Sequence, residues 1–224
     1  MPFNILKSLI PDRAVPLRIW RGPFRGARVV MNPRDSLRKI FGLYEHELNP
    51  WLEQALRRVA RVLDVGANDG YFTFGCAAAF RRMGKPGKII CFEPQARHVE
   101  DLRASVAVQG ESGIHFEIIQ ALVGRAQGEG VTTLDAWPAA DRRNTLVKID
   151  VEGAELDVVE GASCWLESSN LFLIEVHREE TLGKIQDRFS QRSLELECIR
   201  QRPLPFLGRE QREESNWWLV SRLT

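Results

Sequence analysis

The sequence is poor in cysteine and has no long apolar run. Its four cysteines are scattered, with neither a C-x-x-C pair nor the spacing of a metal site. Most of them fall in apolar segments, as buried thiols of a reducing compartment do. No stretch approaches the roughly 18 apolar residues of a membrane span, and the apolar part of residues 1–10 is too short for a signal peptide. We therefore expect a cytoplasmic protein with no integral membrane segment.

The chain also lacks a charge excess, an internal repeat and a low-complexity tract. Its 31 Lys and Arg and 30 Asp and Glu give a net charge of +1, whereas dedicated nucleic-acid binders usually carry a clear basic excess. We therefore expect no nucleic-acid partner. A length of 224 residues suits one sizeable domain. We place it at residues 41–224, after an N-terminal arm and β-hairpin in residues 1–40. The sequence leaves the oligomeric state open.

Strand-like apolar segments alternate with helix-like segments through the middle of the chain. This alternation favours an α/β fold with a mostly parallel sheet that is covered on both faces. Two late strand-like segments, 194–200 and 216–222, have no long helix between them, which predicts an antiparallel hairpin at one edge. The expected helices cover residues 44–60, 71–80, 95–108, 154–166 and 179–191, with a β-hairpin at 17–31 and a loop at 120–131.

The most informative stretch runs from Val62 to Gly70. An apolar strand there passes through Asp64 into a turn that contains Gly66 and Gly70. Glycine permits the backbone angles and the close approach that such a turn needs. A helix that begins at residue 71 would aim its free amide groups at the turn. This arrangement is typical of a site for a nucleoside-like ligand.

The residues of this stretch discriminate between two nucleoside cofactors. A dinucleotide site has the pattern G-x-G-x-x-G, but Asn68 stands in place of the middle glycine. Asp64 would repel a pyrophosphate and suits a ligand that carries an ammonium and a sulfonium. Glu93, after the next strand, would accept hydrogen bonds from ribose hydroxyls, as in NAD enzymes. The pattern favours S-adenosylmethionine, with NAD or a purely structural turn as the alternatives.

Further polar side chains follow two later strands. Asp150 comes at the end of one strand, and Glu175 and His177 come at the end of the next. Because ligands bind at the carboxyl ends of parallel strands, we expect these three side chains to be catalytic. His177 would accept the proton of an acceptor hydroxyl, oriented by Asp150 or Glu175. Glu155, in the first turn of the next helix, is expected to cap it. No metal is expected, although the catalytic set could also hold Mg²⁺ or Mn²⁺.

Taken together, these motifs resemble the FkbM-type S-adenosylmethionine-dependent methyltransferases. The resemblance rests on Tyr44-Glu45, the stretch 63–71, Phe92-Glu93-Pro94 and the run Asp-Val-Glu-Gly-Ala-Glu at 150–155, and it covers residues 40–222. It implies a single-domain Rossmann-like class I methyltransferase fold. It also implies an enzyme that moves a methyl group from S-adenosylmethionine to a hydroxyl of a sugar, glycan or secondary metabolite.

The resemblance further implies which side chains bind the cofactor. Two other functions stay open, an NAD-dependent oxidoreductase and a cofactor-binding partner protein without catalytic activity. The expected partner of the enzyme is a small-molecule or glycan acceptor. The residues expected to bind the cofactor are Glu45, Asp64, Gly66, Asn68, Gly70, Thr73, Glu93, Pro94, Gln120, Ala121 and Asp150.

Overall fold

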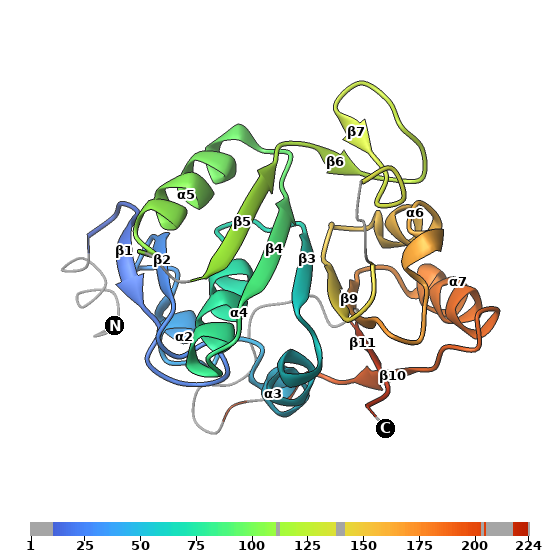
Figure 1. The fold of residues 1–224 in the computed structure, drawn as a ribbon, viewed down its shortest axis with the longest axis horizontal. Helices are drawn as coiled ribbons and strands as arrows, with labels where there is room; N and C mark the ends of the chain where they lie inside the picture. Colours follow the sequence, from blue (N-terminus) through green and yellow to red (C-terminus); the bar gives the residue numbers. More distant parts are fainter. Residues whose placement is uncertain (1–10, 111–112, 138–141, 203, 205–216, 224) are drawn as a thin grey trace, which may run out of the picture.

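A sheet of seven strands forms the centre of the molecule (Figure 1). The computed structural model describes residues 11–110, 113–137, 142–202, 204 and 217–223. The strand order is β10-β11-β9-β8-β3-β4-β5, and the strands from β9 to β5 in this order all run parallel. The strands are β3 (Arg61–Val65), β4 (Gly87–Phe92), β5 (Ile114–Ile119), β8 (Thr145–Ile149), β9 (Leu171–Val176), β10 (Leu196–Ile199) and β11 (Trp217–Ser221).

One strand of this sheet, β11, runs antiparallel to both of its neighbours. It lies between β9 and β10, although it follows β10 in the sequence. The expected fold class is therefore confirmed: an α/β protein with a mostly parallel sheet and an antiparallel strand pair at one edge. Residue 216, predicted to begin the last strand, and the predicted arm of residues 1–10 lie outside the described residues.

Helices cover both faces of the sheet and bury two cores (Figure 1). Successive residues of the central strand enter different cores, because Val62 packs into the first and Leu63 into the second. Within the described residues, no helix has the length and apolar character needed to cross a bilayer. The first core is covered by α3 (Asn49–Arg58), α4 (Tyr71–Arg82) and α5 (Ala96–Ala107), and the second by α6 (Glu155–Glu160) and α7 (Glu179–Ser190).

The predicted N-terminal β-hairpin is confirmed. β1 (Val15–Arg18) pairs antiparallel with β2 (Arg28–Met31) in a separate two-stranded sheet. The loop between them places the ring of Phe24 against α4, with its centroid 5.1 Å from that of Tyr71. The hairpin thus adds its apolar side chains to the first core. A short helix, α2 (Leu37–Ile40), follows it.

The helix predicted over residues 44–60 is shorter than expected. Glu45 adopts a left-handed conformation with a φ of 50°, which a continuous helix does not allow. A 3₁₀ turn, η1 (His46–Leu48), follows it. The α-helix α3 then begins at Asn49 with Pro50 in its first turn, where the missing amide of proline costs nothing.

The helix predicted over residues 154–166 is interrupted. α6 ends at Glu160 and a separate 3₁₀ turn, η2 (Ser163–Trp165), follows. Gly161 lies in the break, where a Cβ would overlap the carbonyl oxygen of Gly124. The region around Gly124 was predicted as a loop, but it contains a short parallel pair of strands, β6 (Leu122–Val123) and β7 (Val131–Thr132).

Candidate active site

The turn after β3 is shaped by glycine and by backbone hydrogen bonds. Gly66 has a φ of 80°, and a Cβ there would overlap the carbonyl oxygen of Asp150. The amides of Gly66 and Ala67 both donate to the carbonyl oxygen of Phe92, at 3.0 and 3.1 Å. The turn therefore brings bare backbone to the carboxyl ends of β3, β4 and β8, as the glycine spacing predicts.

Glu93, directly after β4, presents a fixed carboxylate beside this turn. Its Oε2 accepts a hydrogen bond from the amide of Asn68 and its Oε1 accepts one from the amide of Gln95, both at 2.9 Å. Each carboxylate oxygen can accept a second hydrogen bond, so both can still receive a ligand hydroxyl. His98 lies close by, and its buried Nδ1 has no hydrogen-bond partner within the described part of the chain.

Asp64 lies beneath the turn and has no exposed surface. Its side chain is fully buried, Oδ2 accepts a hydrogen bond from the hydroxyl of Thr73 at 2.6 Å, and Oδ1 lies 3.3 Å from Nζ of Lys148. Lys148 in turn donates to the carbonyl oxygen of Gly66 at 2.9 Å. Asp64 and Thr73 therefore position Lys148, which positions the glycine turn.

Lys148 also forms an ion pair with Asp150, whose Oδ2 is 3.1 Å from Nζ. Burial alone would lower the pKa of Lys148, but the carboxylates of Asp150 and Asp64 outweigh it and hold this pKa well above its ordinary value. Burial would likewise raise the pKa of Asp150, but Lys148 outweighs it and holds this pKa below its ordinary value. Asp150 is therefore ionised at neutral pH.

His177, directly after β9, is held by a buried carboxylate. Its Nδ1 lies 2.6 Å from Oε1 of Glu155, which also accepts a hydrogen bond from the amide of Gly153 at 2.7 Å. Because a carboxylate only accepts, the single ring proton of neutral His177 lies on Nδ1. Nε2 then carries no proton and can accept one. It lies 3.9 Å from Oδ1 of Asp150. The hydrogen bond to Glu155, with help from the carboxylates of Glu175 and Asp150, raises the pKa of His177.

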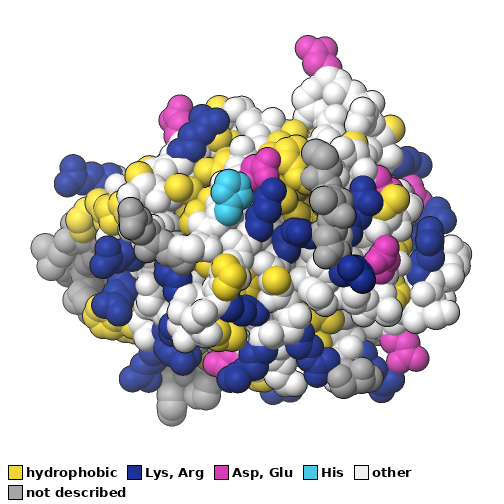
Figure 2. Space-filling view, in the orientation of Figure 1, with side chains coloured by type: hydrophobic (Ala, Val, Ile, Leu, Met, Phe, Trp, Pro, Cys, Tyr) yellow, Lys and Arg dark blue, Asp and Glu magenta, His cyan; other side chains and the backbone are white. Residues whose placement is uncertain are grey.

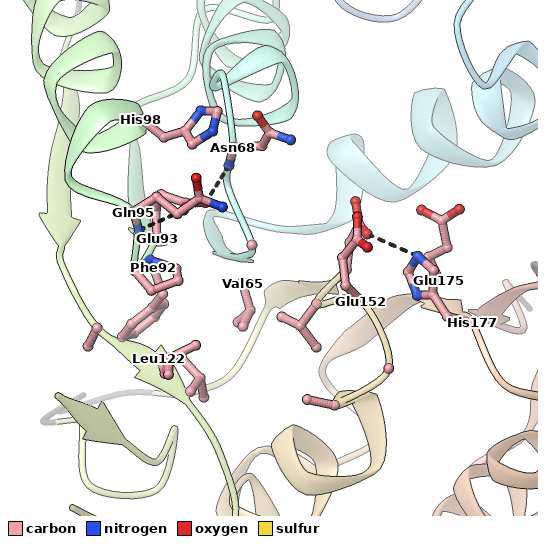
Figure 3. Close-up of a pocket in the computed structure, with 18 of the residues that line it drawn as sticks. Val65, Asn68, Phe92, Glu93, Gln95, His98, Leu122, Glu152, Glu175 and His177 are labelled. Carbon is pink, nitrogen blue, oxygen red and sulfur yellow. Dashed lines mark hydrogen bonds and ion pairs between the residues drawn. The ribbon is translucent and has the colours of Figure 1, made fainter. Parts of the chain in front are cut away.

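Glu93, Asp150 and His177 line one cavity of about 1050 Å³ at the carboxyl ends of the strands. A cavity of this volume is large enough for a nucleoside cofactor together with part of a second small molecule. Figure 3 shows two polar sides separated by an apolar floor. The first side contains Asn68, Glu93, Gln95 and His98, the second contains Glu152, Glu175 and His177, and the floor contains Val65, Phe92 and Leu122.

The structure brings together most, but not all, of the predicted site residues. Gly70 caps α4 and Gln120 donates to the carbonyl oxygen of Pro94 at 3.4 Å, so both are engaged beside the cavity. The predicted residues that line the cavity are Gly66, Asn68, Glu93, Pro94, Ala121, Asp150, Glu175 and His177, and those that do not are Glu45, Asp64, Gly70, Thr73 and Gln120.

The three predicted catalytic side chains meet at one point. One ligand atom from each of Asp150, Glu175 and His177 lies within 4.8 Å of the other two. Two carboxylates and an imidazole are a donor set that suits Mg²⁺ or Mn²⁺. The geometry is therefore compatible both with a histidine base and with a bound divalent cation.

The sequence does not predict the most important contact of this site. It predicts only a capping role for Glu155, yet the oxygen that caps α6 also holds His177. The adjacency of β8 and β9 could have indicated this contact, since it places the residue after one strand beside the first turn after the other. His98 and Arg178 also line the cavity and carry no sequence signal, whereas Tyr44, which lines it too, belongs to the Tyr44-Glu45 motif.

Comparisons with known proteins identify the class of fold. No protein-family model matches the chain, and no curated protein sequence matches it. Solved structures of methyltransferases do match. At the identities involved, 18% and below for the structures described next, this likeness establishes a Rossmann-like methyltransferase fold.

Three such structures illustrate the likeness. Methyltransferase FkbM from Methylobacillus flagellatus KT superposes with a TM-score of 0.57 and 18% identity, over 74% of this chain and 44% of that one. An rRNA methylase from Streptococcus thermophilus gives 0.52 and 14%, over 80% and 97% of the two chains. Trm5b from Pyrococcus abyssi gives 0.50 and 11%, over 90% and 54%. This chain therefore spans less than half of the Methylobacillus protein.

Proposed function

We propose that this chain is an FkbM-type methyltransferase that moves a methyl group from S-adenosylmethionine to a hydroxyl of a small-molecule or glycan acceptor. The observation that carries the proposal is the cavity itself. A carboxylate fixed by two backbone amides lies at one side, and a base held by a buried carboxylate lies at the other. The methyltransferase fold and the motifs at residues 44–45 and 150–155 support the same activity.

The first side of the cavity fits the cofactor. Glu93 has both oxygens oriented by backbone amides and can accept the two ribose hydroxyls. The Gly66 turn has no room for a side chain, so its backbone can approach a ligand closely. When bound, the cofactor supplies a methyl group that is already activated on a sulfonium.

The second side fits the acceptor. Nε2 of His177 accepts the hydroxyl proton as the acceptor oxygen takes the methyl group, while Glu155 keeps the ring proton on Nδ1. Asp150, 3.9 Å from Nε2, stabilises the imidazolium that results. Orientation of the acceptor oxygen provides the larger part of the rate, since positioning can contribute about 7–11 kcal/mol at best.

Calorimetric titration tests the cofactor assignment. S-adenosylhomocysteine should bind the wild-type chain and NAD should not. Glu93→Ala should weaken binding at least 10-fold, because a hydrogen bond to a charged group contributes about 1.5–3 kcal/mol. Glu100→Ala, an exposed carboxylate on α5, is the matched control and should bind normally. Binding of NAD alone would overturn the proposal in favour of an oxidoreductase.

A transfer assay separates an enzyme from an inactive cofactor-binding protein. The chain is incubated with S-adenosylmethionine labelled in the methyl group and with a panel of hydroxylated sugars, glycans and small metabolites. His177→Ala should lower the rate about 10²–10⁴-fold, the usual contribution of a general base. Full activity of this variant would exclude the base assignment. Cofactor binding without transfer to any acceptor would favour the inactive binding protein.

The cluster of Asp150, Glu175 and His177 supports a second catalytic arrangement, in which a divalent cation orients the acceptor. Chelation separates the two. Activity that survives exhaustive treatment with EDTA but is lost in His177→Ala supports the base. Activity that is lost with EDTA and restored by Mg²⁺ or Mn²⁺ supports the cation.

A further inference from the structure

The N-terminal part of the chain differs in charge from the rest. Residues 11–44 contain eight Lys and Arg but only two Asp, whereas residues 45–224 contain 28 Asp and Glu against 22 Lys and Arg. The net charge of +1 is therefore the sum of a basic excess in residues 11–44 and an acidic excess in residues 45–224. In Figure 2, Lys and Arg side chains lie over the part of the molecule that β1, β2 and α2 occupy in Figure 1, and others lie along the lower edge and the right of the same face.

Large apolar side chains are exposed in residues 11–44 as well. Trp20 is 64% exposed, Phe41 41% and Leu37 40%. The rings of Trp20 and Phe41 pack edge to face with their centroids 5.5 Å apart. Leu37 and Phe41 lie one helical turn apart, since the amide of Phe41 donates to the carbonyl oxygen of Leu37. An exposed cluster of this kind on a soluble fold marks a binding surface.

Exposed basic side chains accompany this apolar cluster. The amide of Trp20 donates to the carbonyl oxygen of Ile40 at 2.8 Å, which joins the segment after β1 to the end of α2. The exposed side chains of Arg18 and Arg21 flank Trp20 in the sequence. We call the set Arg18, Trp20, Arg21, Leu37 and Phe41 the basic aromatic surface.

We propose that the basic aromatic surface docks the protein onto an anionic lipid membrane. Tryptophan rings are favoured at the depth of lipid headgroups, and Leu37 and Phe41 can enter the adjoining acyl region. Basic side chains near an anionic membrane each contribute about 1 kcal/mol of attraction. Insertion of three apolar side chains and attraction by nearby arginines are two separate signals, and stable anchoring to a membrane takes two.

Other occupants fit this surface less well. A second copy seated on the same surface would bring two basic surfaces together and would be repelled. Single-stranded nucleic acid stacks its bases on aromatic rings, but only two of the three exposed apolar side chains of this surface carry a ring. Leu37 has no ring to stack on a base. The aliphatic side chain therefore favours a lipid.

The helix that carries Leu37 also contacts residues at the wall of the cavity. Lys39 of α2 forms an ion pair with Asp69 at 2.5 Å and lies 5.0 Å from the ring centroid of Tyr44, which lines the cavity. α2 would thus connect a membrane bound at the basic aromatic surface to the wall of the cavity at Tyr44. Membrane binding itself does not rest on the proposed function and is tested separately.

Vesicle co-sedimentation of the full chain tests the proposal. The protein should bind vesicles of phosphatidylcholine with phosphatidylserine and should not bind phosphatidylcholine alone, and added salt should weaken binding. Arg21→Gln should lower the partition coefficient about five-fold, as expected for the loss of about 1 kcal/mol. Trp20→Ser with Phe41→Ser should lower it further. Arg192→Gln, an exposed arginine after α7, and Met83→Ser, an exposed methionine, are the matched controls and should bind as the wild type does.

Three outcomes would overturn the proposal. The first is no binding to anionic vesicles, or equal loss in the control variants. The second is binding of a single-stranded RNA oligonucleotide that depends on Trp20 and Arg21 while vesicles are ignored. The third is a concentration-dependent rise in mass that Trp20→Ser abolishes, which would assign the surface to a second copy. Each variant should keep the wild-type melting temperature, so that loss of binding is not loss of the fold.

Discussion

The contact between Glu155 and His177 ties the protonation of the proposed base to one buried carboxylate. The pKa of His177 is raised chiefly by this hydrogen bond. The base must be neutral to accept a proton, so activity should rise with pH as His177 loses its proton. Glu155→Gln should shift this rise to lower pH, because it removes the main cause of the raised pKa. It should also lower kcat on the order of 10-fold or more, because the ring loses its orientation. The pH profile of kcat/KM measures the first effect.

Glu160→Gln is the matched control, since Glu160 lies on the same helix but pairs with Arg125 and Arg188 away from the cavity. Its pH profile should equal that of the wild type. An unchanged pH profile in Glu155→Gln would contradict the positioning role of Glu155.

The raised pKa of His177 also affects the stability of the fold. A raised folded pKa of His177 stabilises the fold fully below the unfolded value of 6.5, and this contribution is lost as the pH rises through the folded pKa.

Lys148 compensates the charge of two carboxylates, those of Asp64 and Asp150. Lys148→Met should lower the free energy of unfolding by about 3–5 kcal/mol, because Asp64 and Asp150 lose the ammonium that neutralises them. Urea denaturation measures the loss. Adding Asp64→Asn should recover part of it, because one uncompensated charge is then gone. A double variant as unstable as the single one would show that the two side chains are not coupled.

Asp64 shows how far sequence reasoning reaches at the scale of one residue. The position of Asp64 at a strand end could be predicted, because the apolar pattern of the strand is unambiguous. The direction of its carboxylate could not, since it depends on Lys148, which is 84 positions later in the chain. The same holds for Glu155 and His177, which meet only because β8 and β9 are neighbours. Tertiary structure, not local sequence, decides which side chain becomes the partner of a buried charged group.

At the scale of elements, the turn after β3 has one position that tolerates no side chain. Gly66→Ala should abolish binding of S-adenosylhomocysteine and lower the melting temperature strongly, because the new Cβ would overlap the carbonyl of Asp150 in a left-handed backbone. Gly84→Ala is the matched control. Its φ of 65° is also left-handed, but no atom lies within 4 Å of the added Cβ. It should cost only about 1 kcal/mol and leave binding intact.

Scanning calorimetry and titration of the two variants give the comparison. Equal losses in both would show that backbone strain alone, and not the contact with β8, makes Gly66 necessary.

The helices and strands that were predicted best are those whose pattern is local. The apolar runs at 114–119 and 171–176 each predict a strand with these bounds, and β5 and β9 have them, because both runs are short and clearly flanked. The errors in α3 and α6 have tertiary causes. Glu45 is held in a left-handed conformation. The second helix is interrupted at Gly161, where the backbone carbonyl of Gly124 packs too closely for a side chain. The β6–β7 pair was missed because two residues in each strand carry no pattern.

At the scale of the whole molecule, a bound cofactor should stabilise the fold. A bound cofactor would contact the ends of β3, β4 and β8 together. The unfolded chain does not hold these three ends in one place, so it does not bind the cofactor. S-adenosylhomocysteine at about 100 times its dissociation constant should add about 2.7 kcal/mol, which corresponds to a rise in melting temperature on the order of 5–10 °C. Differential scanning fluorimetry measures this shift. His177→Ala should keep it and Gly66→Ala should lose it, whereas a shift of equal size with NAD would contradict the cofactor assignment.

The position of β11 has a consequence for how the chain is made. During synthesis β9 emerges with β8 on one side and nothing on the other, and it stays so until residues through Ser221 have left the ribosome. Only then can β11 pair with β9. The carbonyl oxygen of Ser221, in β11, then accepts a hydrogen bond from the indole of Trp51 at 2.9 Å. A nascent chain stalled before Trp217 would therefore present an open strand edge to proteases and chaperones, whereas one more short segment would close it.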